Sequence, residues 1–122
     1  MQDENRNPLI LDGYSVAVAA LNDSFRKTMN NTLGRVVLTS SVHDMESHKK
    51  MRLIQEIQEQ EVVTGGGNDP YNEHDFGSLE FEGDSFMWKI DYYDNDYKFG
   101  SDDPSNSKVT QRVLTIMYSS EY

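Results

Sequence analysis

The sequence predicts an α+β domain in which two helices pack on one face of a mainly antiparallel four-stranded sheet. Apolar residues recur at helical spacing early in the chain and at strand spacing later. The resulting element order is α-β-α-β-β-β, and helices that precede a run of hairpin strands favour this class over a parallel α/β fold. The 122 residues suffice for one core, so residues 1–122 are expected to form a single domain.

Two segments have helical periodicity. The first helix is expected over residues 14–30, after Asp12 as N-cap. Its apolar stripe consists of Tyr14, Val18, Leu21, Phe25 and Met29. The second helix is expected over about residues 45–60, with Asp44 as N-cap. Its inward residues are predicted to be Met51, Ile54 and Ile57, with Leu53 beside them.

Four segments indicate strands. Residues 35–40 are short and β-branched, and residues 109–118 predict the last strand. The strongest signal is a hairpin of residues 78–82 and 85–93 around a type II′ turn at Gly83-Asp84. That register pairs Phe81 with Phe86 and Leu79 with Trp88. Residues 1–12 are expected to form a loose arm, and the glycine-rich residues 64–70 a flexible connector.

The charge of the chain is concentrated in one region. The net charge is −10, and residues 69–105 contain eleven acids against two lysines. Such a field repels nucleic acid and anionic membranes and attracts cations or a basic protein surface. The chain has no cysteine, and no run has the length of a membrane span, so a cytoplasmic protein without disulfides is expected. Acidic loops also keep small proteins soluble, and that alternative stays open.

The acids that flank the hairpin are the candidate partner-binding residues. They are Asp69, Glu73, Asp75, Asp91, Asp94, Asp96, Asp102 and Asp103. Most lie in the loops 69–75 and 94–103, which adjoin the end of the hairpin away from its turn. Carboxylates in that arrangement can imitate a line of phosphates. We therefore expect them to bind the basic surface of a nucleic-acid-binding complex, without cofactor and without direct contact to nucleic acid.

A small metal-dependent enzyme is the first alternative. His74, between Glu73 and Asp75, has the chemistry of a metal ligand or general base, with Asp91 as a further carboxylate. Neighbouring residues of a strand point in opposite directions, however, and the loop after Asp94 departs from the calcium-binding pattern. No nucleophile motif is present. The sequence therefore favours a structural role for His74 and a protein that is not an enzyme.

Self-association is the second alternative. His48, Lys49, Lys50 and Arg52 form a basic patch early in the second helix. Pairing of this patch with the acidic loops of another copy would give a homodimer or a structural assembly. A solvated helix face is the simpler interpretation of the patch.

Several motifs resemble a family of small bacterial proteins of unknown function that are common on plasmids and integrated elements. The matching segments are residues 68–70 (NDP), 73–77 (EHDFG), 88–94 (WKIDYYD), 100–104 (GSDDP) and 112–117 (RVLTIM). The resemblance covers residues 16–122, and the family offers no established catalytic residues. Carriage on mobile DNA implies a protein that counters host defence, as anti-CRISPR and anti-restriction proteins do. The expected function is thus a non-enzymatic inhibitor of a host defence complex.

Overall fold

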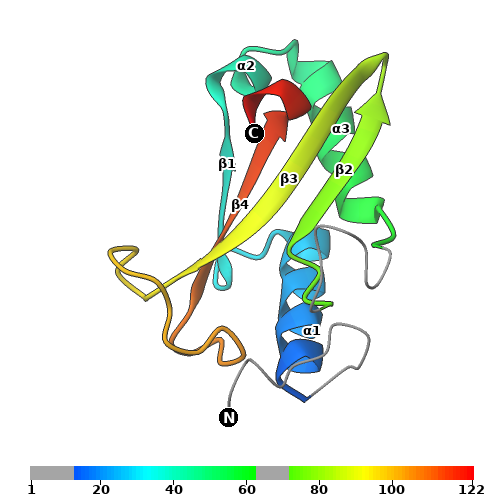
Figure 1. Ribbon diagram of the computed structural model, residues 1–122. Coiled ribbons are helices and arrows are strands. Elements are labelled where there is room, and N and C mark those ends of the chain that lie inside the picture. The colour runs from blue at the N-terminus through cyan, green and yellow to red at the C-terminus, as the bar shows by residue number, and fades with distance from the viewer. Residues whose placement is uncertain (1–12, 63–71) are drawn as a thin grey trace.

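The structure, a computed structural model, describes residues 13–62 and 72–122 (Figure 1). The expected arm at 1–12, its cap Asp12 and the connector at 64–70 lie outside these residues. The elements in chain order are α1 (Gly13–Thr28), β1 (Gly34–Leu38), α2 (Ser40–His43), α3 (Ser47–Glu59), β2 (Phe76–Phe81), β3 (Asp84–Tyr93), β4 (Gln111–Tyr118) and the 3-10 turn η2 (Ser119–Glu121). None of the helices in the described ranges is long and apolar enough to cross a membrane.

The four strands form a mixed sheet in the order β1-β4-β3-β2. β2 and β3 pair antiparallel, as do β3 and β4, whereas β1 pairs parallel with β4. The expectation of a mainly antiparallel sheet is therefore wrong. Between β1 and β4 the chain forms α2, α3 and the hairpin of β2 and β3. This long crossover lets β4 run parallel to β1.

An additional short helix precedes the predicted second helix, because α3 (47–59) lies within the predicted residues 45–60 whereas α2 (40–43) lies before them. The element order therefore differs from the predicted α-β-α-β-β-β. Asp44 is the C-cap of the short α2, and its backbone N–H donates to the carbonyl of Ser40 (2.9 Å). Glu46 caps α3 instead, because its side chain accepts a hydrogen bond from the backbone N–H of Lys49 (2.9 Å). The chain thus changes direction between the two caps.

The hairpin has a different register from the predicted one. Phe81 pairs with Asp84, so the turn residues are Glu82 and Gly83. Both have positive φ, 51° and 89°, which is the signature of a type I′ turn. Leu79 consequently pairs with Phe86. A slip of two residues along a strand keeps every side chain on its predicted face, so the apolar face is unchanged.

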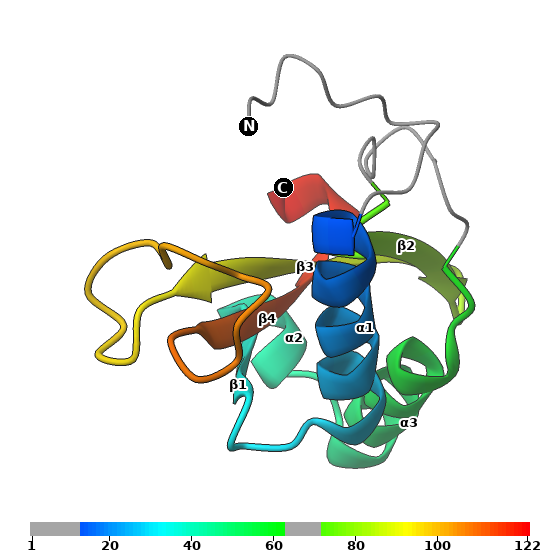
Figure 2. The same ribbon diagram turned by 90° about the horizontal axis from the view of Figure 1, so that it is seen from below.

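The helices pack on one face of the sheet (Figure 2). The core joins helical residues to inward-facing strand residues: Phe25, Val42, Leu53, Ile57, Phe81, Phe86, Trp88, Ile90, Leu114 and Ile116. Trp88 is fully buried, and its indole N–H donates to the side chain of Gln60 (2.9 Å). Opposite it, a Cβ on Gly77 would lie 2.5 Å from the indole, so any larger residue here must displace the indole or the strand.

Met51 does not face the core. Leu53 and Ile57 are fully buried, Ile54 is partly buried, and Met51 is 68% exposed. The buried face of α3 is centred on Leu53 and Ile57. Met51 precedes Leu53 by two residues, which is about 200° around the helix, and therefore projects into solvent.

Candidate acidic interface

Two acid-rich loops leave the sheet at the same end. Residues 72–75 lead into β2, and residues 94–110 connect β3 to β4. The backbone N–H of Ile90 donates to the carbonyl of Asp75 (2.8 Å), so the entrance to β2 lies beside the last part of β3. Both loops are therefore at the end of the hairpin opposite the Glu82-Gly83 turn, in the lower half of Figure 1.

The loop after β3 is fixed by its own carboxylates. Asp94 Oδ1 accepts hydrogen bonds from the backbone N–H groups of Asp96 (3.1 Å) and Lys98 (3.0 Å). Asp103 Oδ1 accepts from the backbone N–H (3.1 Å) and the hydroxyl (2.5 Å) of Ser105. Such contacts replace backbone hydrogen bonds in turns. Asp94 and Asp103 thus hold the loop in one conformation.

The same loop is anchored to the sheet through side chains. The hydroxyl of Tyr97 donates to Gln111 Oε1 (2.9 Å), and the guanidinium of Arg35 lies 3.7 Å from the centre of the Tyr97 ring. The hydroxyl of the buried Thr110 donates to the carbonyl of Asp103 (2.8 Å). These contacts tie the loop to β1 and β4.

Other groups of the loop remain exposed. Asp96 and Asp102 are exposed, and the ring of Phe99 between them is 73% exposed. Asp91, on β3, is different because its carboxylate accepts a charge-assisted hydrogen bond from Lys89 (2.6 Å). The available negative charge is therefore greatest at Asp96 and Asp102.

Beneath the loops lies a buried polar network centred on Asn22 of α1. Asn22 is fully buried, and its Oδ1 accepts from Nε of Arg112 (2.6 Å). Its Nδ2 donates to the carbonyl of Glu73 (2.9 Å) and to the hydroxyl oxygen of Tyr92 (2.9 Å). One amide thus joins α1, β3, β4 and the segment before β2.

Arg112 links this network to the loop after β3. It is fully buried, and its Nη2 donates to the carbonyl of Pro104 (2.6 Å). Burial lowers the pKa of Arg112 from its usual value. Burial also raises the pKa of Tyr92, and the nearby charges of Asp75 and Glu73 raise it further. Tyr92 therefore stays neutral and donates to Glu73 Oε1 (3.3 Å).

The predicted acids surround this end of the sheet from both faces. The charges of Glu73 and Asp75 raise the pKa of Tyr92, so these two acids lie near the face of the sheet on which Tyr92 packs against the core. Asp91 is the neighbour of Tyr92 along β3 and therefore points to the opposite face. Asp94, Asp96, Asp102 and Asp103 lie in the loop after β3, and Asp69 lies outside the described residues. Lys98 and Lys108 are in the same loop. The negative charge there is consequently interrupted by cations.

His74 contacts Asp23 of α1. Its Nδ1 lies 2.9 Å from the carboxylate of Asp23, and its backbone has a positive φ of 58°. Nη2 of Arg26 lies 3.6 Å from the same carboxylate. Within residues 13–62 and 72–122, no group of three or more His, Cys, Asp or Glu is placed to hold a metal. These contacts favour a structural role for His74 in fixing the segment before β2 to α1.

The network residues were not among those predicted from the sequence. Asn22 and Arg26 are polar residues in the buried face of α1, next to Val18 and Phe25. Polar side chains at such positions are the available signal, because a buried polar group needs a partner elsewhere in the fold. The partner itself, Arg112, is 90 positions from Asn22 and has no local signal.

Fold and site together define a small mixed α+β domain in which acidic loops rest on a buried polar network. The chain belongs to the family described as "Protein of unknown function (DUF3768)", which matches residues 38–121. The matched range contains α2, α3 and the strands β2, β3 and β4, together with the loop after β3. No curated protein and no solved structure matches the chain.

Proposed function

We propose that the protein is a non-enzymatic interaction protein that binds a basic protein surface through the loop 94–103. The observation that supports it most is the preorganisation of this loop. Asp94 and Asp103 fix its backbone, while Asp96 and Asp102 remain exposed. A loop already held in one conformation loses less entropy on binding, and opposite charges speed the encounter.

The finer proposal concerns the partner. A chain with a net charge of −10 suits a groove that normally holds the phosphates of nucleic acid. We propose that the partner is a nucleic-acid-binding host defence complex, so that the protein acts as an inhibitor of the anti-CRISPR or anti-restriction type. This proposal includes carriage of the family on mobile elements, which is the context in which such inhibitors act. Glu73, Asp75 and Asp91 would flank the main contact, with a smaller role for Asp91 because Lys89 compensates its charge.

The experiment compares two charge-reversed baits. Wild-type protein, Asp96→Lys/Asp102→Lys, and Glu56→Lys/Glu59→Lys are used to capture partners from bacterial lysate. The second variant makes the same change in net charge at exposed positions of α3, far along the chain from the loop. Both variants change only exposed side chains, so both should keep the fold, which circular dichroism checks.

The expected result is one partner captured by the wild type and by the α3 variant, and lost with the loop variant. Retention of that partner by all three baits would contradict the assignment of the loop. Equal loss with both variants would show that net charge alone, without this loop, governs binding.

A further inference from the structure

β1 is an edge strand whose outer backbone groups face no further strand. In the described part of the chain the sheet ends at β1 on one side and at β2 on the other. The carbonyl of Leu33 accepts from the backbone N–H of Arg112 (2.9 Å), and the N–H of Thr39 donates to the carbonyl of Ile116 (3.1 Å). Backbone groups alternate in direction along a strand, so the N–H and C=O groups of Val36 point away from β4. Figure 2 shows β1 at the margin of the fold.

The usual protections of an edge strand are weak at β1. Natural edge strands are protected by lysines, prolines, bulges or a covering segment. The sequence of β1 is GRVVL, and it pairs with β4 in an unbroken register. Its charged side chain, Arg35, lies with its guanidinium 3.7 Å from the centre of the Tyr97 ring and is thereby held beside the loop after β3. The short helix α2 packs on β4 as well as on β1, so it lies inward from the edge.

The opposite edge of the sheet, at β2, is partly closed. Phe81 and Asp84 flank a two-residue turn and form a hydrogen-bonded pair, so the backbone groups of Ser78 point away from β3. There the carbonyl of Ser78 accepts a hydrogen bond from Nε2 of Gln60 (2.7 Å). Within the described residues, β1 is therefore the edge that can accept a further strand.

The segment around β1 is free of acids in a strongly acidic chain. The protein has 21 acids and a net charge of −10, but residues 24–43 contain no aspartate or glutamate. Two copies can therefore meet at β1 with less repulsion than at the acid-rich loops. One carboxylate does reach the end of the strand, because Glu121 accepts from the hydroxyl of Thr39 (2.8 Å). Some repulsion between two copies consequently remains.

We propose that β1 pairs antiparallel with β1 of a second copy, so that the two sheets become one continuous sheet. When Val36 lies opposite Val36 of the second copy, the two residues exchange both of their backbone hydrogen bonds. On the inner face Leu38 then lies opposite Gly34, which has no side chain. On the outer face Arg35 lies opposite Val37, which is 40% exposed and can pack against the arginine stem. The strand is thus complementary to itself, and this favours a second copy as its occupant.

The dimer is expected to be weak and to strengthen with salt. β1 has five residues, so the contact is small for a stable dimer. The average mass should rise from that of a monomer toward that of a dimer between about 10 µM and about 1 mM protein. Salt screens the repulsion between two chains of charge −10 and should therefore favour the dimer. Because each copy offers one such edge, association should stop at two copies.

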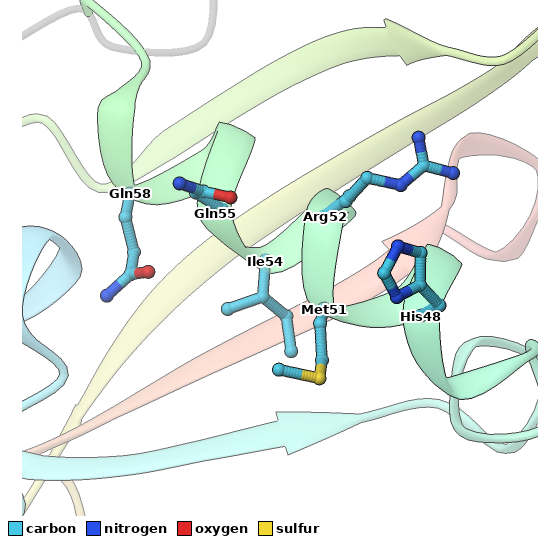
Figure 3. Close-up of a pocket in the computed structure, with 6 residues that line it drawn as sticks. All are labelled: His48, Met51, Arg52, Ile54, Gln55 and Gln58. Carbon is cyan, nitrogen blue, oxygen red and sulfur yellow. The ribbon is translucent and has the colours of Figure 1, made fainter.

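The first test is sedimentation equilibrium of the wild type and two proline variants. Proline removes a backbone N–H and is tolerated on edge strands where that N–H points outward. Val36→Pro should remain monomeric, whereas Ser78→Pro, the same kind of change on the edge of β2, should associate like the wild type. Met51→Asp is a second control, because it changes the apolar hollow on α3, whose lining residues all belong to that helix (Figure 3). It should also associate like the wild type.

The second test is disulfide trapping, which checks the register without a proline. The chain has no cysteine, so introduced thiols react without background. Partners in a non-hydrogen-bonded antiparallel pair have Cα atoms about 4.5 Å apart, which is within disulfide range. A mixture of Arg35→Cys and Val37→Cys should therefore form a linked heterodimer on mild oxidation. Each variant alone should form far less linked dimer, because identical positions are offset along the two strands.

Three results would overturn the proposal. They are a wild type that stays monomeric over the whole concentration range, a folded Val36→Pro that still dimerises, and a cysteine mixture that links no faster than its two components alone. The fluorescence of the buried Trp88 reports whether each variant is folded, and the trapping result decides if Val36→Pro is not. The inference is independent of the proposed function. Val36→Pro should still capture the host partner through the loop 94–103, so failure of one proposal leaves the other standing.

Discussion

Replacing Asn22 by leucine should destabilise the protein strongly. Leucine has nearly the same size but removes all three hydrogen bonds of the buried amide. Nε of Arg112 and the carbonyl of Glu73 then lose the partner that Asn22 supplied, whereas the hydroxyl of Tyr92 keeps its contact with Glu73 Oε1. A buried polar group without a partner costs about 1–3 kcal/mol, and more when charged. Nε of the fully buried, charged Arg112 is such a group, so the expected loss in the free energy of unfolding is about 3 kcal/mol.

The assay is equilibrium unfolding in urea. Trp88 is the single tryptophan and is fully buried, so its fluorescence reports the loss of the core. The matched control is Asn95→Leu, because the amide of Asn95 also donates to a carbonyl, that of Lys108 (2.9 Å), but on the surface. There water can replace the lost partner, and the expected cost is about 1 kcal/mol or less.

A cost for Asn22→Leu no greater than that of the control would refute the reasoning. It would mean that the amide does not hold α1 to the loops, and that the buried network contributes little to their position. A second measurement, hydrogen exchange, should show faster exchange in residues 72–75 and 104–112 of a folded Asn22→Leu variant.

Two further predictions concern the frame of the site. Gly77→Ala places a methyl group 2.5 Å from the indole of Trp88 and should lower the free energy of unfolding in urea by about 1–3 kcal/mol. The control is Gly100→Ala, where the nearest atom is 3.9 Å away, and it should lower the free energy of unfolding much less. Equal losses for the two variants would contradict the packing of Gly77 against Trp88. Hydrogen bonds from the backbone N–H of Tyr118 and the hydroxyl of Thr39 lower the pKa of Glu121. The ionised carboxylate therefore stabilises the fold at neutral pH. That contribution disappears as the pH falls below about 4.5. Glu121→Gln should therefore lose less stability than the wild type between about pH 5 and pH 3, and identical pH profiles would exclude this role.

The local elements of the fold are visible in the sequence. Alternation of Phe86, Trp88 and Ile90 predicts β3 and its buried face, and the periodic apolar residues predict α1. The parallel pairing of β1 with β4 is not visible, because it joins Gly34 to Arg112 across most of the chain. The hairpin register was missed for another reason, since a shift by two residues leaves the hydrophobic pattern unchanged.

The candidate site, too, is only partly predictable from the sequence. The composition shows that the loop 94–103 is acidic, but it does not show which of the acids hold the loop and which are exposed. Asp94 and Asp103 bind backbone groups, whereas Asp96 and Asp102 remain exposed, and this difference depends on the turn that the loop adopts. Contacts such as His74 to Asp23, 51 positions apart, leave no periodic trace in a single sequence.

The most direct test of the interaction proposal is a titration of purified partner with wild-type protein and with Asp96→Lys/Asp102→Lys at several salt concentrations. For the wild type, the binding constant should fall steeply as the salt concentration rises. For the variant, both the affinity at low salt and its dependence on salt should be smaller. An affinity that is indifferent to salt, or the same for both proteins, would show that the acidic loop is not the binding surface.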